Sequence, residues 1–180
     1  MSPKAFASLA VATALCVLLA LGAVFLRDRP VTSIQTSGPL FPDLISHANE
    51  AAAVRVTSAD GQLTIERKGN DWVLKERGGY PVDSDKVRAL VLGLAGLELV
   101  EPRTADPERL ARLELEEPTA KDAKSHEVEI LGTDGKPIAA AVVGRSRYGL
   151  YGGGGSGIYV RKAGDNQSWL ASGSVEVPKA

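Results

Sequence analysis

Residues 152–157 read GGGGSG and carry the most familiar ligand-binding spacing in the chain. Gly152, Gly154 and Gly157 match the G-x-G-x-x-G pattern that cradles the pyrophosphate of a dinucleotide. That chemistry needs a helix directly after the glycines, because the helix N-terminus holds the phosphates. Here the strand-like residues 158–160 follow, and the Lys-Ser/Thr pair of a P-loop is absent. We therefore predict a flexible, exposed hairpin loop that binds no nucleotide.

Other residue types that carry catalysis or bind metals are sparse. His47 and His126 are the only histidines, and a single cysteine is present, so no cluster has the spacing of metal ligands. Glu114, Glu116 and Glu117 could supply paired carboxylates, but a charge run of this kind is typical of a solvated surface. We predict no catalytic residue, no cofactor-binding residue and no metal ligand, and hence a protein that is not an enzyme.

Basic and aromatic side chains flank the glycine loop and could form a contact surface. They are Arg145, Arg147, Tyr148, Tyr151 and Tyr159. Arginine and tyrosine are enriched where proteins bind partners, and loops often carry such contacts. We predict that these five residues contact a protein partner or a glycan. The alternative is that they are ordinary surface residues of a loop.

The first element of the chain is a predicted membrane segment, which would determine where this surface lies in the cell. Residues 5–26 are an unbroken run of apolar and small residues, preceded by Lys4 and closed by Arg27 and Arg29. About 20 apolar residues suffice for a helix to cross a bilayer. A cleaved signal peptide has a shorter apolar core and a small-x-small site, for which residues 20–22 would serve. The length of the run favours a retained single-pass anchor over a cleaved signal peptide.

An N-terminal anchor followed by a globular domain predicts a protein of the inner (cytoplasmic) membrane with its domain in the periplasm. No cysteine follows Cys16, so the exported part has no internal disulfide. The formal net charge of −1 argues against nucleic acid as a partner, because nucleic-acid binding requires a basic surface. The predicted partners are therefore the membrane and a protein of the cell envelope.

Composition and patterning divide the chain into a membrane anchor or signal peptide (1–29), a Pro- and Gly-marked stalk (30–38) and a globular domain (39–178). Within the domain, short segments that alternate apolar and polar residues predict strands. Asp-Gly pairs at 60–61 and 134–135 predict hairpin turns. The predicted strands cover residues 53–57, 62–66, 71–75, 99–103, 127–131, 138–143, 158–161 and 168–170, and residues 144–157 are predicted to be a loop.

The longest helical pattern begins at Asp83 or Ser84, either of which would cap a helix. Apolar residues then recur at helical spacing and form one stripe. The stripe consists of Val87, Leu90, Val91, Leu94 and Leu97. Shorter helical turns are expected over residues 43–49 and 107–112. The predicted fold is therefore α+β: an N-terminal transmembrane helix followed by an antiparallel sheet of hairpins packed by one long amphipathic helix.

Several short motifs occur in a definite order along the domain. They are LFPDL at 40–44, DWV at 71–73, YPVD at 80–83, EPRT at 101–104, GIYVR at 157–161 and QSWLA at 167–171. Their order and spacing resemble the bacterial family known as domain of unknown function 4340 (DUF4340). The resemblance covers residues 40–178 and implies an N-terminal span with an exported α+β domain.

The resemblance also implies an accessory role at the cell envelope, because some family members are encoded with ABC-transporter components similar to the gliding-motility type. It offers no catalytic residues. Two features depart from the family. Glu114 stands where members often have glycine, so the turn there is expected to differ. Members are commonly longer and repeat a similar unit, so this chain is expected to be a minimal member or a truncated product.

Three functional hypotheses follow from these observations. The leading one is a membrane-anchored envelope protein whose non-catalytic domain is a binding or scaffold module, accessory to an ABC-transporter complex. The second is a glycan- or peptidoglycan-binding module that uses the segment from Arg145 to Tyr159. The third is a hydrolase whose site the sequence motifs do not reveal.

Overall fold

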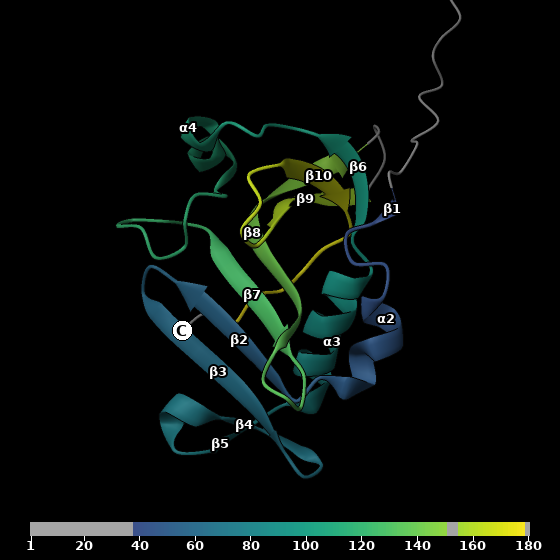
Figure 1. Ribbon diagram of the computed structural model, residues 1–180, viewed down its shortest axis with the longest axis vertical. Coiled ribbons are helices and arrows are strands. Elements are labelled where there is room, and N and C mark those ends of the chain that lie inside the picture. Colours follow the sequence, from purple (N-terminus) through teal and green to yellow (C-terminus); the bar gives the residue numbers. More distant parts are fainter. Residues whose placement is uncertain (1–37, 151–154, 179–180) are drawn as a thin grey trace, which may run out of the picture. The chain divides into compact units, whose positions relative to one another are not determined.

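The computed structural model describes residues 38–150 and 155–178. These residues form one sheet of ten strands in the order β1-β6-β10-β9-β8-β7-β2-β3-β4-β5, and all neighbouring strands are antiparallel (Figure 1). The strands are β1 (Gly38–Pro39), β2 (Ala53–Ser58), β3 (Gly61–Lys68), β4 (Asp71–Leu74), β5 (Tyr80–Val82), β6 (Glu98–Pro102), β7 (His126–Leu131), β8 (Pro137–Leu150), β9 (Gly155–Lys162) and β10 (Ser168–Ser172). The helices are α2 (Leu44–His47), α3 (Ser84–Ala95) and α4 (Pro107–Leu110), with 3₁₀-helices η1 (Ala48–Glu50), η2 (Lys75–Arg77) and η3 (Ala111–Leu113).

The predicted α+β class is wrong, because most of the described chain belongs to this single sheet. The one long amphipathic helix is also wrong. α3 has only twelve residues and ends at Ala95, and α2 and α4 have four each. Leu97 of the predicted stripe lies beyond the helix, because the chain turns at Gly96 and enters β6. Residues that the pattern left outside strands, such as those of β5, pair with their neighbours and enlarge the sheet.

The predicted membrane segment cannot be compared with the structure. The anchor or signal peptide (1–29) and residues 30–37 of the stalk lie outside the described residues. In the part of the chain that the structure does describe, no helix has the length and apolar character needed to cross a bilayer.

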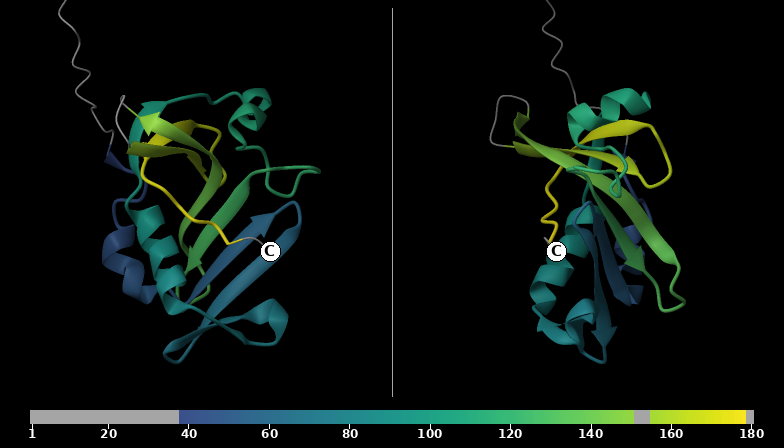
Figure 2. Two further views of the ribbon diagram at one scale, coloured as in Figure 1. Left: turned by 180° about the vertical axis from the view of Figure 1, so that it is seen from behind. Right: turned by 90° about the vertical axis from the view of Figure 1, so that its left-hand side faces the viewer.

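One face of the sheet is buried beneath α3 (Figure 2). Because side chains alternate along a strand, Val54, Val128 and Val160 all point to this face, and each is 0% exposed. Leu90 and Leu94 of α3 pack against them and are 2% and 0% exposed, so the predicted burial of both leucines is confirmed. This face therefore holds the main apolar core of the domain.

Polar groups and close backbone contacts hold α3 in place. The side chain of Asp83 accepts a hydrogen bond of 2.9 Å from the N–H of Asp85 and caps the first turn. The last described segment of the chain crosses the helix at Gly93, where a Cβ would lie 2.9 Å from the carbonyl oxygen of Ser174. Glycine at this position therefore lets the C-terminal segment pass directly over α3.

The opposite face of the sheet carries a second, smaller apolar cluster. Val142, Tyr159 and Leu170 from β8, β9 and β10 are covered there by Leu110 of α4 and by Leu115. The predicted cap of α4 is present, since the Asp106 side chain accepts a hydrogen bond of 3.1 Å from the N–H of Glu108. The segment from α4 to residue 117 thus acts as a cover for one end of this face.

The predicted loop over 144–157 is wrong in its described parts, residues 144–150 and 155–157, which are strand. Residues 151–154, which carry most of the predicted glycine loop, lie outside the described residues. β8 continues to Leu150 and pairs with β9, with Ser146 opposite Ile158 and Tyr148 opposite Ser156. An irregularity in the register between Val143 and Ser146 inserts one extra residue in β8, which is a β-bulge. A Cβ at Gly144 within this bulge would lie 2.7 Å from the carbonyl oxygen of Glu114. Glycine therefore allows the α4–η3 cover to approach the strand.

Glu114, at the turn that is expected to differ from the family, adopts a left-handed backbone conformation with φ of 58° and ends η3. Left-handed conformations place Cβ close to a backbone carbonyl and are unfavourable for residues other than glycine. The turn at Glu114 therefore has the backbone geometry that suits glycine, and Glu114 adopts it with backbone strain.

We expect Leu94→Ala to lower the free energy of unfolding by about 2–5 kcal/mol, because the side chain is fully buried and its removal leaves a cavity. Urea-induced unfolding of the full-length chain measures the change. Leu92→Ala on the same helix is the control, since Leu92 is 47% exposed and should change the stability by less than about 0.5 kcal/mol. Equal losses from the two substitutions would show that the stripe does not face the core.

Glu114→Gly should raise the free energy of unfolding by up to about 1 kcal/mol. Relief of the left-handed strain exceeds the entropy that glycine adds to the unfolded chain. Glu108→Gly is the matched control, because Glu108 lies in α4 and its replacement should cost about 0.5–1 kcal/mol. Thermal unfolding of the two variants beside the parent chain tests the expectation, and a loss of stability in Glu114→Gly contradicts it.

Candidate functional site

The predicted contact surface lies along β8 rather than on a loop. Arg145 and Arg147 are exposed, and Tyr148 is 86% exposed. Tyr151 lies outside the described residues. β-Strand pairing with β9 fixes the backbone that carries these side chains, which lowers the backbone entropy lost when a partner binds. Arg147 and Tyr148 are paired with Gly157 and Ser156, so their side chains point to opposite faces of the strand. We refer to this segment of β8, with Arg145, Arg147 and Tyr148, as the β8 surface.

Tyr159, the fifth predicted residue, supports the β8 surface from below. It is only 6% exposed and belongs to the second apolar cluster. The guanidinium carbon of Arg145 lies 5.4 Å from the centre of its ring, and that of Arg103 lies 5.7 Å away. Such cation–π contacts stabilise the charged groups and fix their orientation. Tyr159 therefore contributes to the surface through the position of Arg145.

The β8 surface coincides with an open strand edge. β7 pairs with β8 only as far as Val143, opposite His126. From Ser146 to Leu150, β8 has β9 on one side and, among the described residues, no strand on the other. The ends of β8 and β9 extend past β7 (Figure 2). An open edge presents unpaired backbone N–H and C=O groups, which an extended segment of another chain can pair with.

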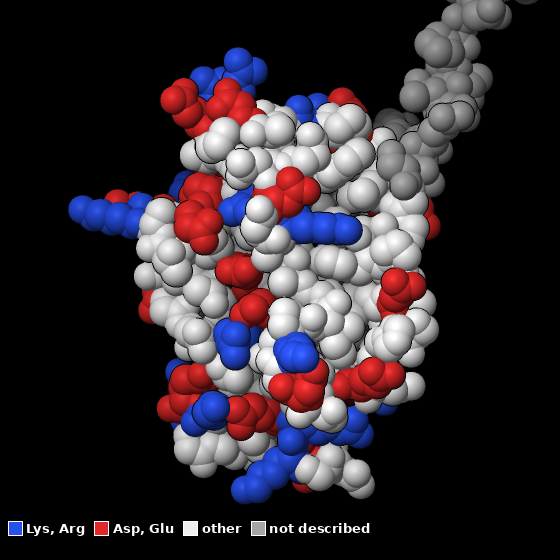
Figure 3. Space-filling model, viewed as in Figure 1, with Lys and Arg blue, Asp and Glu red and all other residues white. Residues whose placement is uncertain are grey.

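The charge of this edge is locally basic. Within the described residues, neither Arg145 nor Arg147 forms an ion pair with a carboxylate. Elsewhere the charges are mixed, and over the face shown in Figure 3 basic and acidic residues are interspersed. The two free guanidinium groups therefore give the β8 surface a local preference for acidic partners, without a strong field around the whole domain.

Arg161 is the most buried charged side chain near the surface, and it has a structural role. Its Nε donates to the carbonyl oxygen of Leu115 at 2.8 Å, its Nη1 to that of Asp165 at 3.2 Å, and its Nη2 to Oε2 of Glu117 at 3.5 Å. A buried charge is tolerated only when it is bonded in this way. Arg161 thereby ties the cover of the second cluster to β9.

Glu127 on β7 is a carboxylate of this face with a perturbed acidity. Burial raises the pKa of Glu127, and the nearby charges of Glu129 and Glu117 raise it further. His126 is its neighbour in sequence, but successive residues of β7 point to opposite faces, so the imidazole and the carboxylate do not form an acid–base pair. Among the described residues, no three His, Cys, Asp or Glu side chains gather as metal ligands would.

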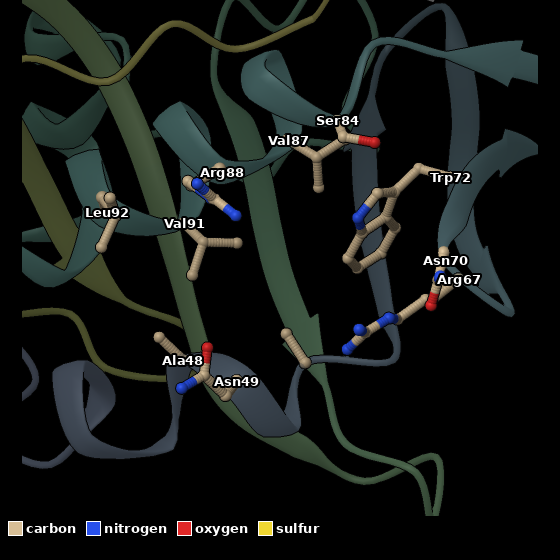
Figure 4. A pocket seen from close by; sticks show the side chains of 11 residues that line it. Ala48, Asn49, Arg67, Asn70, Trp72, Ser84, Val87, Arg88, Val91 and Leu92 are labelled. Atoms are coloured by element: carbon tan, nitrogen blue, oxygen red, sulfur yellow. The ribbon is translucent and has the colours of Figure 1, made fainter.

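A pocket of about 360 Å³ opens on the other face of the sheet, between α3, η1 and the β3–β4 hairpin (Figure 4). Arg67 and Trp72 are directly opposite each other on β3 and β4, and Arg88 reaches the pocket from α3. Val87 and Val91 form its apolar wall. Sequence patterning assigned Trp72 to the core and did not identify this pocket. The unusual placement of Arg67 on the core-facing side of β3 is the signal that could have revealed it.

Comparison with known proteins places the chain in a family. The family described as domain of unknown function (DUF4340) matches residues 72–177, which is more than half of the chain, and the protein belongs to this family. The matched range runs from Trp72 in β4 to Val177 and includes the β8 surface. Neither the curated proteins nor the solved structures contain a match to the chain.

The raised pKa of Glu127 predicts a pH-dependent effect of its replacement. A carboxyl group whose folded-state pKa is raised favours folding at pH values below its unfolded pKa, and this contribution is lost as the pH rises through the folded pKa. Glu127→Gln should therefore raise the melting temperature at neutral pH, and the gain should disappear in acid, where the carboxyl group is protonated in both states. Exposed Glu108→Gln is the control. A gain that is equal in neutral and acidic solution would contradict the role of the ionised carboxylate.

Proposed function

We propose that this DUF4340 protein is a non-catalytic binding or scaffold module of the cell envelope. In this proposal, residues 1–29 anchor the chain in the inner membrane, residues 30–37 form a stalk, and the domain, which begins with β1 at Gly38, lies in the periplasm. The apolar run of residues 5–26 supports the anchor. The resemblance drawn from the sequence motifs supports a protein partner among ABC-transporter components.

The observation that carries the proposal is the edge of β8 beyond Val143, which has no partner strand among the described residues on one side and carries basic and aromatic side chains. An extended segment of a partner could pair with the backbone beyond Val143 and extend the sheet. Acidic residues of that segment would meet the exposed arginines Arg145 and Arg147, and an apolar or aromatic residue would pack on Tyr148. Backbone pairing would then supply affinity and the side chains would supply selectivity.

A glycan or peptidoglycan strand is the second candidate for this surface. The ring of Tyr148 is 86% exposed, and an exposed aromatic ring suits a sugar as well as a peptide. The two candidates differ in their dependence on charge. Binding of an acidic peptide should weaken as salt screens the arginines, whereas stacking of a neutral sugar on Tyr148 should persist.

Affinity capture with the full-length chain from solubilised membranes tests both candidates. Arg147→Glu should reduce the recovery of a protein partner by at least about tenfold, because it places like charges together. Tyr148→Ala should also reduce it. Arg77→Glu is the control, since Arg77 is exposed on η2 and does not belong to the β8 surface. The charge-reversed β8 variant should still fold, because the side chain that it replaces is exposed.

The outcomes separate the parts of the proposal. Recovery of envelope sugars that depends on Tyr148 but not on Arg147 would favour the glycan-binding module. Partner recovery that neither variant changes would show that the β8 surface is not the binding site. If the full-length chain is absent from the membrane fraction, the proposed anchor is wrong.

A further inference from the structure

The pocket beneath α3 has donors of hydrogen bonds on its rim and apolar side chains in its wall. We propose that it binds a small organic anion, in which a carboxylate or another oxyanion is carried on an apolar body. This site lies on the face of the sheet opposite the second apolar cluster, so it goes beyond the function proposed for the β8 surface.

The basic rim is the first part of the argument. The side chains of Arg67, Trp72 and Arg88 are directed toward the pocket from different sides (Figure 4). Within the described residues, no carboxylate pairs with either guanidinium group and no acceptor bonds to the Trp72 indole N–H. None of the residues that line the pocket is acidic. An oxyanion would satisfy these donors through charge-assisted hydrogen bonds.

The apolar wall is the second part. Val87 and Val91 of α3 are 2% and 5% exposed, and Ala51 beside η1 is 3% exposed. The indole of Trp72 closes the pocket on the side of β4. A bare inorganic anion would leave this apolar surface in contact with water, whereas an acyl or aromatic group would cover it.

The size and the construction of the pocket fit such a ligand. A volume of about 360 Å³ lies within the range of small-molecule sites, roughly 300–1,000 Å³. Strand pairing fixes the backbone at Arg67 and Trp72, and a capped helix fixes it at Arg88, so the donors extend from ordered elements. Asn49 and Asn70 add amide groups at the rim that could select among ligands.

The two tryptophans of the chain provide a direct assay. In the uniformly ¹⁵N-labelled full-length chain, each indole N–H gives one NMR signal. Phenylacetate, hexanoate and N-acetylleucine are titrated as carboxylates on three apolar bodies, with phenylacetamide as the uncharged match and inorganic phosphate as the bare oxyanion. At least one carboxylate should shift the Trp72 signal saturably and leave that of Trp169 in place. Phenylacetamide and phosphate should bind at least about tenfold more weakly.

Substitutions then test which residues hold the anion. Arg67→Gln and Arg88→Gln should each weaken carboxylate binding by roughly tenfold or more, because each removes a charged donor. Arg112→Gln is the control, since Arg112 is exposed on η3 and does not line the pocket. Melting temperatures close to that of the parent chain would show that both variants fold.

Several results would overturn the proposal. They are an unmoved Trp72 signal with all three carboxylates, binding of phenylacetamide equal to that of phenylacetate, and unchanged affinity in both arginine variants. Tight binding of phosphate alone would assign the pocket to a bare oxyanion and would also overturn the apolar part of the proposal. Capture of a partner by the β8 surface should be the same in Arg67→Gln and in the parent chain. The proposal for the pocket and the proposal for the β8 surface are therefore tested independently.

Discussion

Burial of one sheet face under α3 is the interaction on which the rest of the domain depends. β2, β7 and β9 are distant in sequence, yet Val54, Val128 and Val160 meet on this face because each strand alternates its side chains in register with its neighbours. α3 fits over them with its own buried leucines, and the C-terminal segment passes over the helix at Gly93. A shift of one residue in any central strand would exchange the buried and exposed faces. The register therefore fixes which side chains remain available for binding.

The same register places the two candidate sites on different parts of the sheet. On β3 and β4, the register directs Arg67 and Trp72 to the face that α3 covers. Both residues lie near the strand ends, where α3 leaves the pocket open above them. On β8, the bulge at Gly144 lets the α4–η3 cover approach the strand. Beyond the bulge, β8 pairs with β9 on one side and, among the described residues, with no strand on the other. Both sites thus occur where the close packing of the core ends. Their side chains project from strands and a helix rather than from loops, which favours binding without backbone rearrangement.

Local sequence signals were reliable where a short segment decides its own structure. Asp83 and Asp106 cap α3 and α4 as their side chains predict, and the Asp-Gly pairs at 60–61 and 134–135 lie at the turns of hairpins. The fold class was wrong for a different reason. Gly-rich and irregular segments such as 144–150 carry no clear alternation, and they become strand only because β9 offers hydrogen-bonding partners. Strand formation of this kind depends on a neighbour, so it is not encoded in the segment alone.

The sequence by itself determined the capped helix starts, the hairpin turns, the alternating strands of the core and membership of the DUF4340 family, because each of these depends on residues close together in the chain or on their order. It also identified Arg145, Arg147 and Tyr148 as a group, since they are neighbours in the chain. Only the tertiary structure decided that Tyr159 lies beneath Arg145, that the described edge of β8 is open, and that Arg67, Trp72 and Arg88 surround one pocket. These relations arise from contacts between segments that are far apart in sequence, and their geometry is set by the register of the sheet and the position of α3.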